Sequence, residues 1–349
     1  MVSALLLARA GHQVTVLEKN QDFAREFRGE ALQPRFLHSM VNEGLLSLVQ
    51  SLPHESFSDL RMFYRGKELT RIGLSRLDAE FPYVTWIPQP TLLNGLYEEA
   101  KKHSNFDLRF GARVSSLLRE GEKITGVKFA IGGGEESLES DVVIGADGRF
   151  SKLRHLLNSQ LAYSSYDFDV MWFEMERPPS YAHGADFFLS PDMNCLILPK
   201  HPNKIQVGIL VKPAEVKEQR KKGAAWIASR LKRVHPMFES FADELIDFKA
   251  FTVLEAKIEM VKQWAYPGLV LVGDAAHTCS PAGAIGVTIA VETAIAAVHV
   301  INKCAETGDF SKEALGEVQR LREHEVRRVH KIQRRAVGAI VGNPLTRRL

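Results

Sequence analysis

Cysteine is scarce in this sequence, and its scarcity limits the kinds of protein that the chain can be. Cys195, Cys279 and Cys304 are the only cysteines among 349 residues, and they stand far apart. An odd number at such spacing matches neither a disulfide framework nor a C-x-x-C metal site. We therefore expect no metal centre, and we expect a reducing, cytoplasmic compartment.

Features typical of secreted and membrane proteins are weak or missing. The apolar N-terminal residues lack the basic region of a signal peptide and lead directly into a strand pattern. The most apolar segment, residues 283–304, carries Glu292 in its middle, and an ionised carboxylate at bilayer depth is costly. The many alanines and glycines of this segment instead favour a helix that packs tightly on a sheet.

A strong charge of either sign is missing as well. The formal net charge is only +3, which is too small to indicate nucleic-acid binding. Apolar residues make up 45% of the chain and charged residues 25%, as in ordinary globular proteins. A chain of this length can bury a large core, so we expect several domains or one large α/β assembly.

What the chain does contain begins with half of a nucleotide-binding unit. Residues 4–8 are good helix formers, Gly11 can cap that helix, and residues 14–17 form a short apolar strand that leads to Glu18. In dinucleotide-binding folds an acidic residue at this place binds a ribose, about 20 residues after the glycine fingerprint G-x-G-x-x-G. Counting back from Glu18 leads to just before Met1, so we expect the fingerprint upstream of this chain. The alternative interpretation is that residues 4–18 form an ordinary αβ unit capped by glycine, with no nucleotide site.

Two later segments repeat this pattern of a strand followed by a turn. One predicted buried strand ends at Asp147-Gly148, and another ends at Gly273-Asp274. After the second, a proline- and glycine-rich loop enters a helix whose first backbone N–H groups can face an electron-rich ligand. Ligands collect at the carboxyl ends of parallel strands. Acidic residues at three such ends predict one long ligand, although each dipeptide alone more often marks a plain turn.

A β-rich layer interrupts the α/β pattern. Residues 158–262 alternate and turn like antiparallel strands around one helical stretch, and residues 61–85 are typical of short strands with turns. The triple glycine at 132–134 lies between two strands and predicts a hairpin turn rather than a phosphate-binding loop. Four aromatic residues of the layer are expected to form one wall of an apolar pocket: Trp172, Phe173, Phe187 and Phe188.

Four segments together resemble the class A flavoprotein monooxygenases, the para-hydroxybenzoate hydroxylase-like family. They are VTVLEK, RGEALQP, DGRFSKLR and GDAAHTCSPAGAIG, and the similarity runs from Met1 to roughly residue 335. The resemblance implies an α/β fold with a Rossmann-like FAD-binding domain, an inserted β-rich substrate domain and a C-terminal basic helical region. The FAD-binding domain would comprise residues 1–60, 86–157 and 263–305, the substrate domain residues 61–85 and 158–262, and the helical region residues 306–349.

The resemblance also implies which residues contact the cofactor. It places Glu18 at the adenosine ribose, Arg28 near the pyrophosphate, and Asp274 at the ribityl and ribose hydroxyls. Two positions depart from the family pattern, because Gln89 stands where arginine is common and Thr288 stands where asparagine is common. The remaining implied FAD contacts are Lys19, Gln89, Val114, Asp147, Gly148, Gly273, Pro281, Gly283, Gly286, Val287 and Thr288.

The activity that the resemblance implies is oxygen transfer. Members of the family reduce FAD with NADPH or NADH, add O₂ at the flavin C4a position to form a hydroperoxide, and hydroxylate or epoxidise an aromatic or other electron-rich small molecule. His277 is a candidate general base, although a lone histidine after a strand is more often structural. The alternatives are a flavin reductase or halogenase of the same fold, and a truncated, non-catalytic remnant that cannot retain FAD.

Basic residues concentrate between Arg320 and Leu349. A helix with this composition predicts a solvated basic face. A weak contact with an anionic membrane surface, or attraction of a phosphorylated electron donor, is the second interpretation.

Overall fold

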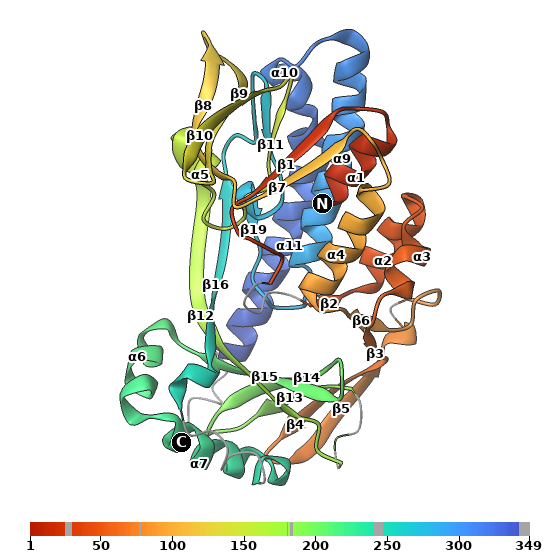
Figure 1. Cartoon of the computed structure of the whole chain (residues 1–349). Coiled ribbons are helices and arrows are strands. Elements are labelled where there is room, and N and C mark those ends of the chain that lie inside the picture. The colour runs from red at the N-terminus through yellow and green to blue at the C-terminus, as the bar shows by residue number, and fades with distance from the viewer. Residues whose placement is uncertain (25–29, 77, 180, 182–183, 240–246, 342–349) are drawn as a thin grey trace.

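The structure, a computed structural model, describes residues 1–24, 30–76, 78–179, 181, 184–239 and 247–341. It contains an α/β part and a β-rich part, which share two long strands, β12 (Leu161–Glu176) and β16 (Thr252–Val261) (Figure 1). This arrangement agrees with the α/β fold and inserted β-rich layer expected from the sequence.

Parallel strands form the first part as two separate sheets. In one sheet β1 (Val14–Glu18) pairs with β7 (Phe106–Phe110). In the other sheet β11 (Val143–Gly145) pairs with β18 (Leu269–Leu271), and β17 (Ala265–Tyr266) adds an antiparallel edge. Short apolar runs of this kind suit parallel strands that are covered on both faces. The glycine loop and the strand expected before it stay a prediction.

Helices cover these sheets with their apolar sides. One core cluster joins α1 (Val2–Arg9), α4 (Gln89–Ala100) and the long α9 (Gly286–Thr307) to β18 through Leu5, Leu96, Ile301 and Val270. The same cluster includes residues of α2 (Pro34–Asn42), α3 (Leu46–Ser51) and α10 (Lys312–Leu315). Short 3₁₀ turns occur at Leu74–Arg76, Pro236–Phe238, Phe248–Ala250 and Gly273–Ala275.

Two small antiparallel sheets lie beside the parallel strands. β8 (Arg113–Glu120), β9 (Lys123–Ile131) and β10 (Gly134–Glu139) form one of them. Gly132 and Gly133 make the turn between β9 and β10 with φ angles of +57° and +83°, which confirms the expected hairpin. The other small sheet contains β2 (Ala31–Leu32), β6 (Val84–Trp86) and β3 (Glu55–Phe57).

The inserted layer is an eight-stranded sheet in the order β19-β16-β12-β15-β14-β13-β4-β5. Residues His201–Asn203 make the turn between β14 and β15. The bounds of its other strands are β4 (Asp59–Tyr64), β5 (Lys67–Gly73), β13 (Ala185–Leu189), β14 (Asn194–Lys200), β15 (Lys204–Val211) and β19 (His277–Thr278).

The eight-stranded sheet has two different faces because side chains alternate along each strand. The outer face is covered by α6 (Pro213–Lys222) and α7 (Ala224–Val234), and its core includes Phe173 and Phe188. The inner face carries Trp172 and packs against Trp86 and Ala284 of the α/β part. Trp172 therefore lies on the opposite side of the sheet from Phe173 and Phe188, so the expectation that all four aromatic residues form one wall is wrong.

The helix α11 (Glu317–Val341) packs along α9 at the C-terminal end of the described chain (Figure 1). Among the described residues, α9 is long and apolar enough to cross a membrane, but half of its most apolar window is buried inside the fold. Glu292 of α9 accepts hydrogen bonds from Arg35, at 2.5 Å, and from Arg322 of α11. These ion pairs explain the acidic residue in an apolar helix, and they agree with the predicted core helix.

Candidate functional site

The carboxyl ends of β1, β11 and β18 carry the predicted acidic residues. At the end of β1, the backbone N–H of Asn20 donates to Glu18 Oε1 at 3.0 Å, and the Glu18 carbonyl accepts from Ala112 at 2.9 Å. Lys19 is exposed, and Val114 is half-buried on β8 shortly after Ala112. These residues therefore lie near one strand end, and their contact with FAD stays a prediction. Arg28 lies outside the described residues.

After β11, Asp147 organises its own turn. Its carboxylate accepts from Ser151 Oγ at 2.6 Å and from the backbone N–H of Leu153 at 3.0 Å, at the start of α5 (Lys152–Leu156). Gly148 has a φ of +79°, which a residue with a side chain rarely adopts. The D-G motif thus has a local structural role, and its contact with a ligand stays a prediction.

Arg149, which the sequence motifs did not single out, joins the second and third strand ends. Its Nε donates to Asp274 Oδ2 at 3.2 Å, and its other nitrogens donate to the carbonyls of Glu255, at 2.5 Å, and Cys279, at 2.9 Å. The side chain of Asp274 keeps 31% of its surface exposed. Arg149 follows directly after the D-G dipeptide, but its partners are more than one hundred residues away, so no local pattern could have identified them.

The loop after Asp274 is shaped by close packing and by left-handed backbone. A Cβ on Gly273 would lie 3.1 Å from the Cβ of Ala290 in α9, so this turn approaches the helix closely. Gly283, with a φ of +79°, is exposed, and nothing lies within 4 Å of the place where its Cβ would be. The loop contains Pro281 and leads into α9 at Gly286.

The start of α9 has no side-chain cap. Its first backbone N–H groups therefore lack an intrahelical partner and carry the positive end of the helix dipole. Together with an exposed glycine and carboxylates at three strand ends, this arrangement fits FAD, whose hydroxyls donate to carboxylates and whose ring has an electron-rich edge. The two following residues point inward, because Val287 packs on the core and Thr288 is fully buried. Their predicted FAD contact would use the backbone.

Gln333 of α11 is a second residue that the sequence motifs did not single out. It is 4% exposed, and its Nε2 donates to the carbonyls of Ser280 and Ala282, both at 2.8 Å, while its Oε1 accepts from the Ser280 N–H at 3.2 Å. The C-terminal helix thus fixes the loop that carries Pro281. Gln89 stands at the first turn of α4 and is half-buried.

The position of His277 favours the structural interpretation. It is 1% exposed, its Nε2 pairs with Thr293 Oγ1 at 2.8 Å, and its ring lies 4.9 Å from that of Trp264. Burial, with a smaller effect of His330, lowers the pKa of His277 to about 3. A buried histidine that stays neutral at ordinary pH is poorly placed to exchange protons with a ligand.

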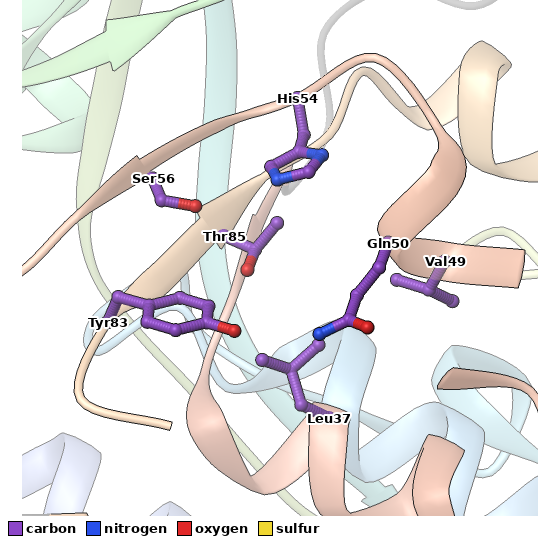
Figure 2. A pocket seen from close by; sticks show the side chains of 7 residues that line it. All are labelled: Leu37, Val49, Gln50, His54, Ser56, Tyr83 and Thr85. Atoms are coloured by element: carbon purple, nitrogen blue, oxygen red, sulfur yellow. The ribbon is translucent and has the colours of Figure 1, made fainter. Parts of the chain in front are cut away.

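Two cavities lie away from these strand ends. One, of about 250 Å³, is lined by residues of α2, α3, β3 and β6 (Figure 2). Thr85 and Tyr83 point into it, whereas Val84 and Trp86 pack on the inner face of the large sheet. The other, of about 530 Å³, lies beside α6 and α7 and includes Asp192 and Arg230. No predicted cofactor residue lines either cavity, so neither cavity replaces the strand ends as the candidate FAD site.

Comparisons with known proteins identify a family. The family model described as an FAD binding domain matches residues 1–329. The 6-methylpretetramide 4-monooxygenase of Streptomyces rimosus is 30% identical over 336 residues, which cover 95% of this chain and 79% of that protein.

Two solved structures have the same fold. PqsL of Pseudomonas aeruginosa, in complex with 2-aminobenzoylacetate, has a TM-score of 0.84 at 19% identity and covers 97% of this chain and 93% of that one. The p-nitrophenol 4-monooxygenase PnpA of Pseudomonas putida has a TM-score of 0.79 at 19% identity and covers 97% of this chain and 85% of that one.

Proposed function

Because the chain belongs to the class A FAD-dependent monooxygenases, we propose that it hydroxylates an aromatic ring bound against the inner face of the eight-stranded sheet. The protein is an FAD-dependent enzyme that uses NAD(P)H and O₂. When bound, FAD supplies the reduction of O₂ and the transfer of one oxygen atom to the substrate. The protein's own residues bind the cofactor and the ring and orient them toward each other.

The proposed FAD site runs along the carboxyl ends of the parallel strands. Glu18 would accept hydrogen bonds from the adenosine ribose, and Asp274, held by Arg149, would accept them from the ribityl and ribose hydroxyls. The uncapped start of α9 would direct its backbone N–H groups toward the electron-rich edge of the ring. Gly283, with nothing within 4 Å of its Cβ position, leaves room for a flat ring to approach the backbone.

The proposed substrate position follows from the inner face. Its apolar residues include Phe168, Trp172 and Leu198, and they meet Ala282 and Ala284 of the loop before α9. This apolar contact region joins the substrate sheet to the proposed flavin loop. An aromatic ring is a good match because large apolar rings bury much surface against such walls. The name of one structural relative, p-nitrophenol 4-monooxygenase, includes a nitrophenol.

Isotope incorporation tests this function. Protein loaded with FAD is mixed with NADPH or NADH, isotope-labelled O₂ and a panel of phenols, aminobenzoyl compounds and fused-ring phenols. One labelled oxygen atom should appear in a ring product, and at limiting FAD the amount of product should fall with Asp274→Ala. If NAD(P)H is oxidised but no compound acquires the label, the reductase alternative replaces the hydroxylase. The preferred electron donor is the one with the higher kcat/KM.

A further inference from the structure

A buried carboxylate lies where the α/β part meets the inner face of the sheet. Glu30, just before β2, is 5% exposed, and its carbonyl accepts from the backbone N–H of Ile87 at 3.0 Å. Its carboxylate also accepts from the backbone N–H of Gln89, one of the predicted FAD contacts. Its second oxygen, Oε2, has no hydrogen-bond partner within 3.5 Å among the described residues, and its ion-pair partner Lys200 lies slightly farther away, at 3.6 Å. Buried carboxylate oxygens are normally hydrogen-bonded, so this one needs an explanation.

Lys200 connects this carboxylate to the surface. Its Nζ lies 3.6 Å from Glu30 Oε2 and also donates to Glu174 Oε1. The exposed fraction of the side chain rises from 6% at Glu30 through 14% at Lys200 to 37% at Glu174. The Nζ of Lys204 lies 3.8 Å from the second oxygen of Glu174, Oε2. The chain of ionisable groups therefore runs without a break from the interior to solvent.

The environment makes Glu30 a stronger base than an ordinary carboxylate. Burial is the largest effect and raises the pKa of Glu30, Lys200 opposes the rise, and Glu174 adds to it. The backbone N–H of Gln89 favours the ionised form but does not reverse the shift. A carboxylate whose pKa is raised accepts protons closer to neutral pH, as a general base needs. Among the described residues, Lys200 and Glu174 are the charged groups that affect the pKa of Glu30.

Gln206 gives an independent sign of a ligand at the same place. On β15 it lies opposite Glu174 of β12 and opposite Leu198 of β14, so it belongs to the inner face. It is 1% exposed, and neither Oε1 nor Nε2 has a hydrogen-bond partner among the described residues. A buried amide with an unused donor and an unused acceptor can receive a polar group that both gives and accepts a hydrogen bond.

We propose that Glu30 accepts the proton of a ring hydroxyl on the substrate, that Gln206 binds the same polar edge of the ring, and that Lys200 and Glu174 carry the proton to water. The hydroxyl O–H bond breaks, its electron pair stays on the ring oxygen, and an O–H bond forms on Glu30. Lys200 then takes this proton while it passes one of its own to Glu174, which releases it. The ring oxygen, now negative, makes the ring a better acceptor of an oxygen atom. The inference rests on the proposed function.

The competing explanation is that Glu30 only fastens β2 to β14 and to the start of α4. Glu55 of β3 provides a matched control, because it forms a 2.9 Å ion pair with Arg177 next to the same small sheet. Glu30→Gln and Glu55→Gln remove the same charge. A structural role predicts that the two variants lower the melting temperature and leave proton exchange with a ligand unchanged.

The experiment measures the ionisation of bound 4-nitrophenol, whose phenolate is coloured. After a rapid rise in pH, the probe bound to FAD-loaded wild type and to Glu55→Gln should ionise quickly, whereas the probe bound to Glu30→Gln should ionise about tenfold more slowly because its proton acceptor is gone. The equilibrium pKa of the bound probe should not rise with Glu30→Gln, because a neighbouring carboxylate opposes formation of the phenolate. Equal rates of ionisation in all three proteins overturn the proposal, and so does failure of wild type to bind the probe.

Infrared difference spectra test the same group without a ligand. A protonated-carboxyl band should titrate at a higher pH than an ordinary carboxyl group in wild type, persist in Glu55→Gln and vanish in Glu30→Gln. If Glu30→Gln does not fold, Lys200→Gln serves instead, and its band should titrate at higher pH than in wild type because the facing cation is gone. A band that is absent or unshifted in wild type overturns the proposal.

The isotope experiment separates failure of this inference from failure of the proposed function. If wild type inserts labelled oxygen into phenols and Glu30→Gln keeps the same kcat pH profile, the inference alone is wrong. If no ring compound is labelled, the proposed function fails, and the infrared titration still decides whether Glu30 holds a proton.

Discussion

Arg149 Nε lies 3.2 Å from Asp274 Oδ2, and this ion pair joins the turn after β11 to the turn after β18. The remaining nitrogens of Arg149 hold the carbonyls of Glu255 and Cys279. One side chain thus fixes the D-G turn, the G-D turn and β16 in a single arrangement. The two sequence motifs therefore form one structural unit.

Loss of the Asp274 carboxylate should weaken FAD binding. A hydrogen bond to a charged group contributes about 1.5–3 kcal/mol, which corresponds to roughly a 10- to 100-fold rise in Kd. Asp274→Ala should show this rise by fluorescence titration with FAD, and Arg149→Ala should show a smaller one because the carboxylate remains. Asp141→Ala, at an exposed residue before β11, is the control and should bind as wild type does. Unchanged affinity in Asp274→Ala would remove Asp274 from the site.

Gln333 should affect FAD binding although it lies on the C-terminal helix. Gln333→Ala removes three hydrogen bonds to the loop at Ser280 and Ala282, so we expect about 1–3 kcal/mol lower stability and weaker FAD binding. Gln319 is the matched control, since it binds the backbone of Trp264 and Lys262 from the same helix. Gln319→Ala should lower the melting temperature and leave the Kd for FAD unchanged. Equal effects of both variants on that Kd would contradict the prediction.

Two buried histidines should make the protein sensitive to acid. Burial lowers the pKa of His277 to about 3 and that of His330 to about 4, while both groups titrate near 6.5 in the unfolded chain. The unfolded state binds more protons below pH 6.5, so stability is full above that pH and falls on acidification by about 1.4 kcal/mol per pH unit for each histidine.

Thermal denaturation between pH 7 and pH 5 checks this. The melting temperature of His277→Gln should fall less with acidification than that of wild type, and the kcat pH profile near neutral pH should keep its shape. If kcat instead no longer falls at acidic pH in His277→Gln, the result would favour His277 as a general base.

The close approach of Gly208 to Trp172 should determine where the Trp172 ring lies on the inner face of the sheet. A Cβ at Gly208 would lie 2.6 Å from the Trp172 ring, so Gly208→Ala must displace that ring. Overpacking of this kind costs about 1–3 kcal/mol. We expect a lower melting temperature, a changed tryptophan emission and weaker substrate binding with normal FAD binding. Gly134→Ala, whose Cβ would have only a 3.7 Å contact, is the control. Unchanged emission would show that the ring does not move.

Part of the protein could be predicted from its sequence because the relevant signals are local. An apolar strand followed by a glycine and an acidic residue is encoded in a few consecutive positions, as at Gly273-Asp274 and at β1 with Glu18. The hairpin at residues 132–134 and the helix at 286–307 follow from the same kind of signal. The family and the class of reaction were implied by the resemblance of these motifs to the class A flavoprotein monooxygenases.

The tertiary structure decided which side chains meet. Arg149 and Asp274 are 125 positions apart, and Gln333 and Ser280 are 53 apart. Glu30 meets Lys200 only because β2 packs on the inner face of the large sheet, and the same packing separates Trp172 from Phe173. Such contacts depend on how sheets and helices stack, and the burial that raises the pKa of Glu30 arises from many distant residues at once. No short stretch of sequence contains that information.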